Sequence, residues 1–250
     1  MKHGLYTCLS ALFFVVSFAV SGGIDCFAAE DLTFTEANAK ALKSDNPDAV
    51  ADVLFKLADM NEKKGKDALK PAVPALIQAA DRELKLPEDQ RWNLVDIVKI
   101  LSMTGDERTK PMLLRVMSAM WGGGNPFVAQ GLVLIGQSTI PSVVDSLKSA
   151  NPDTRGRAAL TLHKMAQFDT AGAFFSKENR EMIKKLLIGN LNDENVNVRI
   201  YTVVAMRSFG DNSVIPVLEH IEKYDAHKDS GGTYEVRLEA TETLKKLRGK

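Results

Sequence analysis

Apolar residues recur along most of the chain with the spacing of one buried helix face. They stand at positions i, i+3, i+4 and i+7, or close to that, in one segment after another. The segments are residues 50–57, 94–101, 113–120, 128–135, 140–147, 196–204 and 214–221. This period is typical of amphipathic α-helices about three turns long. Strand-like alternation of apolar and polar residues is nearly absent, so the pattern predicts an all-α protein.

Asn-Pro pairs mark the predicted starts of several helices. Asn46-Pro47, Asn125-Pro126 and Asn151-Pro152 each stand just before an apolar segment. An Asn side chain accepts hydrogen bonds from unpaired amides of the first turn, and a Pro at the next position has no amide to leave unpaired. Three such pairs in one chain indicate a recurrent way of starting a helix.

A second pattern joins consecutive helices. Gly105-Asp106 is followed by Pro111, and Gly210-Asp211 is followed by Pro216 at the same distance. Gly136 and Pro141 form a version that is one residue shorter. A glycine closes one helix, and a proline in the first turn of the next helix sets the bend.

These signals together predict about five helical hairpins and a closing helix. Short connections between helices favour antiparallel neighbours, and a hairpin that cannot bury its apolar face alone must stack on the next one. An N-terminal capping helix is expected over 30–44, and the first hairpin is divided into helices 47–61 and 67–85. The hairpins are expected at 46–86, 88–121, 125–150, 151–191 and 192–228, and the closing helix at 234–248.

The fifth predicted hairpin resembles a known repeat family. The run Asn195-Val196-Asn197-Val198-Arg199, continued by Val203-Val204-Ala205, Gly210-Asp211 and Ile215-Pro216-Val217-Leu218, is similar to a HEAT repeat. It is most similar to the short bacterial type first associated with phycobilisome lyases, and Tyr234-Glu235-Val236-Arg237 repeats its first half. The second and third hairpins match loosely, and the first and fourth depart from the pattern. The resemblance implies a right-handed α-α superhelix, a HEAT-like and armadillo-like solenoid.

The N-terminal segment has the pattern of a secretory signal peptide. Lys2 and His3 precede the apolar run 5–20, Ser21-Gly22-Gly23 breaks it, and Cys26 and Ala28 are small residues placed for cleavage after Ala28. The expected organisation is a signal peptide at 1–28 and a single repeat domain at 29–250, in a periplasmic or secreted protein. The alternative is a membrane anchor through residues 5–20. Cleavage removes Cys8 and Cys26, the chain's two cysteines, which suits an oxidising compartment.

Charge and motifs narrow the function. The chain has 32 basic and 32 acidic residues, so no long-range field favours nucleic acid. No nucleophile elbow, phosphate loop or zinc-binding helix motif stands out, and we expect no cofactor. His220 and His227 are two turns apart, whereas helical metal pairs are usually one turn apart, so a solvated helix end is favoured over a metal site. Phe174 and Phe175 are expected to fold back over the core, with an exposed contact patch as the alternative.

The sequence therefore favours a non-catalytic scaffold that binds a protein or peptide on a concave helical surface. By the usual geometry of such arrays, the second helix of each hairpin is expected to line that surface. An accessory subunit of an envelope complex and a lyase-type enzyme stay open as alternatives. The membrane is a partner only if the N-terminal segment is retained. The candidate partner-binding residues are Arg108, Arg115, Trp121, Lys148, Arg180, Lys184, Glu219 and Glu222.

Overall fold

The computed structural model describes residues 32–120 and 125–249. The chain separates into a unit 1–32 and a unit 33–250, and the description below concerns the second unit. The predicted signal peptide at 1–28 and Trp121 lie outside the described residues. Within them, no single helix is long and apolar enough to cross a membrane. One pair, Pro126–Ile135 and Gln137–Ser146, meets that test jointly but is bent by 118°.

All regular structure in the described residues is helical, as the sequence predicts. Twelve α-helices are joined by short loops and 3₁₀ turns, and their bounds follow the predicted hairpins closely. The helices are α1 (Glu36–Ala41), α2 (Pro47–Lys64), α3 (Val73–Lys85), α4 (Leu94–Thr104), α5 (Lys110–Ala119), α6 (Asn125–Ile135), α7 (Ile140–Ser146), α8 (Pro152–Phe168), α9 (Lys177–Asn190), α10 (Val196–Phe209), α11 (Ile215–Tyr224) and α12 (Glu235–Arg248). The 3₁₀ turns are η1 (Lys66–Ala72), η2 (Glu88–Gln90), η3 (Glu107–Thr109), η5 (Gln137–Thr139) and η6 (Asn212–Val214).

The predicted N-terminal capping helix is shorter than expected. It spans Glu36–Ala41 rather than the range 30–44, because Thr35 already serves as its N-cap. Thr35 and Asn38 form a reciprocal capping box, in which each side chain accepts a hydrogen bond from the backbone amide of the other residue. The helix ends at Leu42, which is fully buried.

Asparagine caps begin three of the long helices in the same way. The Asn46 side chain accepts from the amide of Asp48 at 3.0 Å, and Asn151 accepts from Asp153 at 2.8 Å. Asn195, which has no proline after it, accepts from the amides of Asn197 and Val198. The cap is thus set by the asparagine, and the proline adds a preformed first turn.

Four of the second helices in the hairpins begin with a 3₁₀ turn followed by proline. Helices α3, α5, α7 and α11 each carry Pro in their first turn. Gly105 and Gly136 precede two of these turns with positive φ values of 59° and 121°, which non-glycine residues rarely adopt. Gly210 stands at the matching position with a φ of −76°. A side chain there is blocked instead by space, because a Cβ would lie 2.6 Å from the Met206 carbonyl oxygen.

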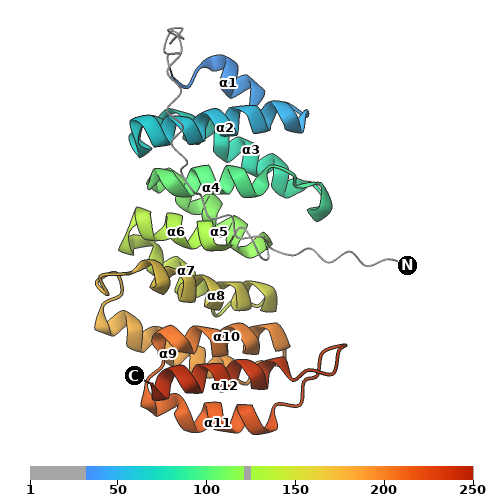
Figure 1. Ribbon diagram of the computed structural model, residues 1–250, viewed down its shortest axis with the longest axis vertical. Helices are drawn as coiled ribbons and strands as arrows, with labels where there is room; N and C mark the ends of the chain where they lie inside the picture. The colour runs from blue at the N-terminus through green and yellow to red at the C-terminus, as the bar shows by residue number, and fades with distance from the viewer. Residues whose placement is uncertain (1–31, 121–124, 250) are drawn as a thin grey trace, which may run out of the picture. The chain divides into compact units, whose positions relative to one another are not determined.

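The hairpins stack into two rows of helices (Figure 1). We call α2, α4, α6, α8, α10 and α12 the A helices and α3, α5, α7, α9 and α11 the B helices. Consecutive A helices pack against one another along the whole array, most extensively α8 against α10, whereas consecutive B helices make little mutual contact beyond α3 and α5. The core lies between the rows and is built from fully buried aliphatic side chains, among them Leu57, Leu76, Leu101, Leu113, Leu132, Leu162, Ile183 and Leu218.

A glycine in α6 allows close packing of two A helices. A Cβ at Gly131 would lie 2.9 Å from the Ser102 Cα of α4, so the two backbones can approach to this extent only because no side chain separates them. At Gly156 of α8 a Cβ would lie 3.5 Å from the Val198 Cα of α10, which is an ordinary van der Waals contact.

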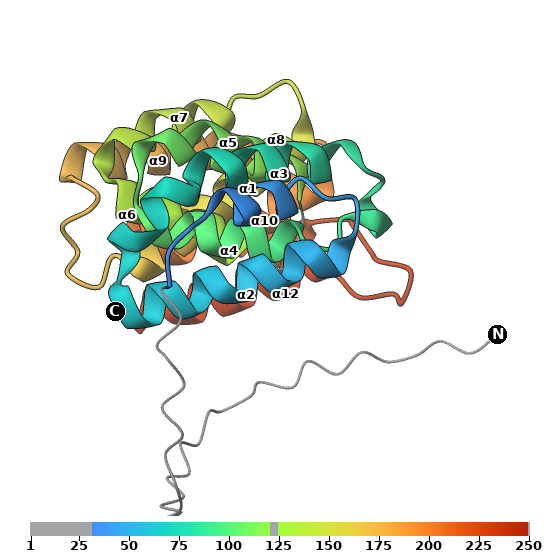
Figure 2. The ribbon, with the colours of Figure 1, turned by 90° about the horizontal axis from the view of Figure 1, so that it is seen from above.

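The shorter spacing of the A row bends the unit toward that side. Seen from above, α2 and α12 lie furthest toward the lower edge, α4 and α10 are set back behind them, and α7 lies furthest away (Figure 2). The expectation that the B helices line the inner side is therefore wrong. The A helices form the recessed face, because consecutive A helices pack against one another more closely than consecutive B helices do.

Paired Arg–Asp contacts link the C-terminal repeats. Arg155 of α8 makes two hydrogen bonds, of 2.9 and 3.0 Å, to the carboxylate of Asp193, which lies one repeat later. Arg199 of α10, at the same position after its Asn cap, contacts Asp225 of the following loop at 2.8 and 3.3 Å. Both arginines also donate to the backbone carbonyls that precede their own helix. Each pair therefore fixes the start of one hairpin to the start of the next.

Candidate functional site

The predicted charged residues lie on or next to the B helices, and most are engaged within the protein. Arg108 contacts the Asp106 carboxylate through two nitrogens and donates to the Lys70 carbonyl. Arg115 of α5 contacts Asp81 of α3 at 2.7 Å. These two arginines thus connect the second hairpin to the first.

The remaining predicted cations are spread along the B row. Lys148 lies 3.6 Å from Asp145 on an exposed surface. Lys184 contacts Asp211 at 2.6 Å and Glu181 at 2.9 Å. The hydrogen bond from Lys184, together with those from Ser213, lowers the pKa of Asp211 to about 2. Lys184 therefore joins α9 to the turn before α11.

Arg180 lies against a small aromatic cluster between the fourth and fifth hairpins. Its guanidinium lies 5.7 Å from the ring centroid of Phe175 and 5.8 Å from that of Phe209. The two rings pack edge to face, with centroids 5.2 Å apart. Phe175 is buried, so this phenylalanine folds back over the core as expected. The Phe174 ring packs edge to face against the Phe175 ring and is partly exposed.

The two predicted glutamates contact the closing helix. Glu219 pairs with Arg248, and Glu222 accepts a hydrogen bond from the Thr241 hydroxyl at 2.7 Å. Together with the cations above, these side chains occupy separate positions on α5, α7, α9 and α11 and their flanking turns. The structure does not bring them together into one site, and it gives them roles in joining neighbouring helices.

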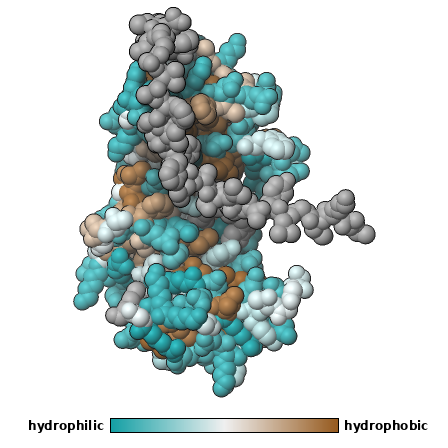
Figure 3. Space-filling view, viewed as in Figure 1, coloured by the Kyte–Doolittle hydropathy of each residue, from teal (hydrophilic) through white to brown (hydrophobic). Residues whose placement is uncertain are grey.

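The A-helix face, which we define as the solvent-facing side of the A helices, carries exposed apolar side chains. Among them, Phe55 of α2 is 80% exposed, and Leu134 of α6 and Leu238 of α12 are about half exposed. Figure 3 looks onto this face and shows apolar patches between hydrophilic ridges. Scattered exposed leucines are ordinary, but several on one recessed face are typical of an interaction surface.

Phe55 borders a small cleft between the first two A helices. The cleft has a volume of about 280 Å³ and is lined by Leu54 and Ala58 of α2 and by Lys99 and Ile100 of α4. Leu54 and Ile100 are buried at its floor. An apolar side chain of a partner could fill this space and cover the Phe55 ring.

A second, larger groove runs between α8, α10 and α12, and we call it the α8–α12 groove. Its volume is about 810 Å³, and its walls include His163 and Gln167 of α8, Arg207 of α10, and Leu238 and Lys246 of α12. The His163 ring is almost fully buried at the floor. A recessed wall that combines polar, charged and apolar groups offers both orientation and contact area to a ligand.

Both ring nitrogens of His163 have partners. Nδ1 lies 2.8 Å from the Ser208 hydroxyl of α10, and Nε2 lies 3.1 Å from the Gln167 amide nitrogen one turn further along α8. With the amide nitrogen as donor, Nε2 accepts and Nδ1 donates to Ser208. A serine nucleophile needs an imidazole base that is itself oriented by a carboxylate. Here an amide takes that place, so the arrangement fits a structural role better than a catalytic one.

The surroundings of His163 are positively charged. Burial, followed by the charges of Lys164, Lys246 and Arg207, lowers the pKa of His163 to about 4. The ring is therefore neutral at physiological pH, and it is a polar, uncharged group at the floor of the groove. Ser208 and Lys246 lie far along the chain from His163, so no local sequence pattern signals this site.

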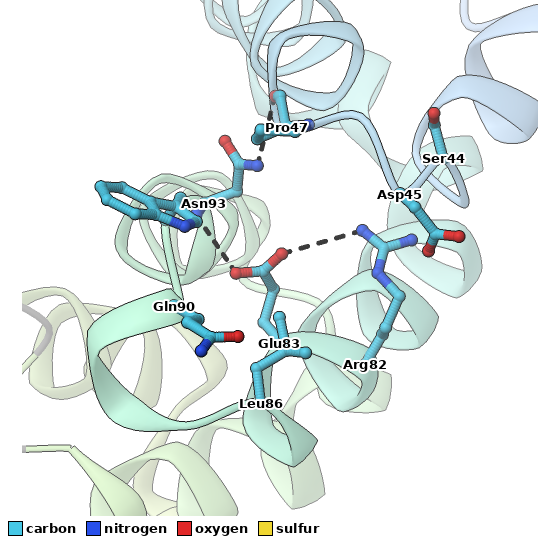
Figure 4. A pocket seen from close by; sticks show the side chains of 9 residues that line it. Ser44, Asp45, Pro47, Arg82, Glu83, Leu86, Gln90 and Asn93 are labelled. Carbon is cyan, nitrogen blue, oxygen red and sulfur yellow. Dashed lines mark hydrogen bonds and ion pairs between the residues drawn. The ribbon is translucent and has the colours of Figure 1, made fainter.

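The first hairpin carries a third recess, shown in Figure 4. It has a volume of about 380 Å³ and lies between the loop before α2, the end of α3 and the loop before α4. The Glu83 carboxylate is buried there, accepts from the Asn93 amide at 3.2 Å and lies 3.8 Å from Arg82. The Asn93 side chain donates to the Pro47 carbonyl at 3.3 Å, so these polar groups hold the first two repeats together.

Trp92 stands at the edge of that recess and is 74% exposed. Exposed tryptophans are frequent anchors of protein interfaces. Trp121, and not Trp92, was predicted from the sequence to contact a partner. Trp92 stands in the polar run Glu88-Asp89-Gln90-Arg91-Trp92-Asn93, which has no apolar pattern of a buried helix face, and this was the available signal.

The histidines near the end of α11 do not form a metal-binding cluster in the described residues. His220 stacks against Tyr224 with a centroid distance of 4.8 Å, and the backbone amide of His227 donates to Asp225. Across 32–120 and 125–249, no group of three or more His, Cys, Asp or Glu side chains is placed to hold an ion.

Comparisons with known proteins do not assign an activity. No family model matches the chain, and no curated protein does. Among solved structures, a designed armadillo repeat protein is 16% identical over 84% of this chain and 98% of its own, with a TM-score of 0.39. An engineered protein is 17% identical over 86% of this chain and 98% of its own, with a TM-score of 0.43. The stacked hairpins themselves confirm the predicted helical-repeat architecture.

Proposed function

We propose that the protein is an exported, non-catalytic scaffold that binds a protein partner on its A-helix face. The observation that carries this proposal is the set of exposed apolar side chains on the recessed row: Phe55, Leu134 and Leu238. A rigid array of helices presents such side chains at fixed distances, so little conformational entropy is lost on binding. The charged residues of the B row are satisfied within the protein and serve its stability.

Export rests on the N-terminal pattern. Cleavage after Ala28 gives a mature chain of 222 residues that begins at Ala29 and has no cysteine. Intact-mass measurement of the protein from its native envelope tests this directly. The mass of the 222-residue chain is expected, whereas the mass of all 250 residues would mean that residues 5–20 anchor the protein instead.

Cross-linking in the native cell envelope, followed by purification of a tagged chain, tests the partner. The double variant Phe55→Asp with Leu134→Asp places two charges on the A-helix face and is expected to lose the cross-linked partner. The matched control is Met182→Asp with Ile188→Asp, since both are exposed apolar residues on the B helix α9. Loss of the partner in the control, or its retention in the A-face variant, would contradict the proposal.

A further inference from the structure

The α8–α12 groove combines positive charge with an apolar contact. Lys246 of α12 lines it. This lysine forms no ion pair with another residue in the described part of the chain. Its charge is therefore available to a ligand.

The other charged groups of the groove are already paired. Arg207 of α10 bonds to Glu239 and to the Thr243 hydroxyl, and Lys245 contacts Glu242 at 2.7 Å. These pairs cancel locally and leave Lys246 as an uncompensated positive charge on the wall of the groove, which has the neutral His163 ring at its floor. Such a site attracts an anion.

The wall supplied by α12 adds an apolar component. Leu238 is 56% exposed and borders the same groove. On the opposite wall, Gln167 offers its amide to hydrogen-bonding groups of a ligand, although its nitrogen also contacts His163. A ligand that fills the groove must then carry a carboxylate, polar main-chain groups and an apolar side chain together, which is the chemistry of a peptide.

We propose that the α8–α12 groove binds an acidic segment of the protein partner, in which Asp or Glu stands near an apolar residue. The carboxylate contacts Lys246, and the apolar side chain packs on Leu238. This inference rests on the proposed scaffold function and names the chemistry of its partner. Nucleic acid is a poorer fit, because a run of successive phosphates needs several unpaired cations and the groove is lined by one, Lys246.

Selection from a phage-displayed library of random ten-residue peptides tests the proposal on the mature chain. Peptides with Asp or Glu next to an apolar residue are expected to be enriched. The variant Lys246→Glu is expected to bind them at least about tenfold more weakly. The matched control is Lys185→Glu, which changes the net charge equally at an exposed position of α9 and is expected to bind normally.

Three outcomes would overturn the inference: no enrichment, enriched peptides without acidic residues, or equal losses in the two charge variants. Binding of a single-stranded RNA decamer to the mature chain, without binding of any selected peptide, would also overturn the inference. The scaffold proposal is tested separately, because Phe55 and Leu134 lie outside this groove. A partner lost only in the Phe55–Leu134 variant, with no acidic peptide selected, would leave the scaffold standing and remove this inference alone.

A spectroscopic readout places the peptide in the groove. A bound carboxylate offsets the positive charges around His163, so the pKa of its imidazole is expected to rise on saturation with an enriched peptide. NMR titration of the histidine ring protons measures this, with His163→Gln to assign the signal. An unchanged pKa at saturation would show that the acidic group binds elsewhere.

Discussion

His163 makes the stability of the protein depend on pH. Its folded-state pKa of about 4 lies below the ordinary value of 6.5, so the unfolded chain binds the proton more readily. The stabilising effect is present in full above pH 6.5 and is lost as the pH falls from 6.5 toward 4. The difference corresponds to at most about 3 kcal/mol.

Urea unfolding at pH 7.5, 5.5 and 4.5 measures this contribution. The His163→Gln variant is expected to lose less stability over this range than the unaltered protein. Arg207 of α10, Lys246 of α12 and the carboxylates of Glu239 and Glu242 line the same groove as the ring, and all of them are unchanged in the variant. Parallel pH profiles for the two proteins would mean that His163 is not a source of the dependence.

Gly131 and Gly189 form a matched pair of helical glycines. A Cβ at Gly131 would lie 2.8 Å from the Leu113 Cδ1 and 2.9 Å from the Ser102 Cα, whereas one at Gly189 meets nothing within 4 Å. Gly131→Ala is expected to destabilise the protein by about 1–3 kcal/mol through overpacking. Gly189→Ala is expected to stabilise it by up to about 1 kcal/mol, because alanine favours the helix. Chemical denaturation measures both; equal effects would contradict the close approach of α4 and α6.

The Arg199–Asp225 contact acts at the level of the helical hairpin. Burial works to raise the pKa of Asp225, but hydrogen bonds from Arg199 and from the His227 amide outweigh it and leave the pKa lowered. Arg199→Ala is expected to cost about 2–3 kcal/mol, because it leaves a largely buried carboxylate without its cation. A double-mutant cycle with Asp225→Asn measures the coupling. A coupling near zero would mean that the contact does not join the repeats.

Helix bounds were predictable from the sequence because their signals are local. Asn46, Asn151 and Asn195 form their caps within three residues, and Pro111 and Pro216 act in their own first turns. The partners of charged residues were not predictable in this way. Arg115 meets Asp81 and Lys184 meets Asp211 only after the hairpins stack, so residues that look available in sequence are satisfied in the fold.

The direction of bending is a property of the whole repeat unit, and it was not predicted correctly from the sequence. It follows from how closely the consecutive helices of each row pack, which is closer in the A row. A glycine in the middle of a helix costs stability unless a neighbouring backbone needs the space. Gly131 on the A helix α6 was therefore a local signal of this close packing.

A stacked array should respond locally to damage at its end. Each hairpin contacts mainly its neighbours, so stability is close to a sum of repeat and interface contributions. Leu247 is buried in α12, at the end of the array. Leu247→Ala is expected to cost about 2–4 kcal/mol in the last repeat and to loosen α11 and α12 first. Hydrogen exchange read by mass spectrometry should then show faster exchange in 212–249 and unchanged protection in α4 and α6.

Gly131→Ala is the counterpart in the middle of the array, and it should speed exchange in α4 and α6 while leaving α12 protected. Uniform acceleration along the chain in both variants would mean that the hairpins unfold as one cooperative block.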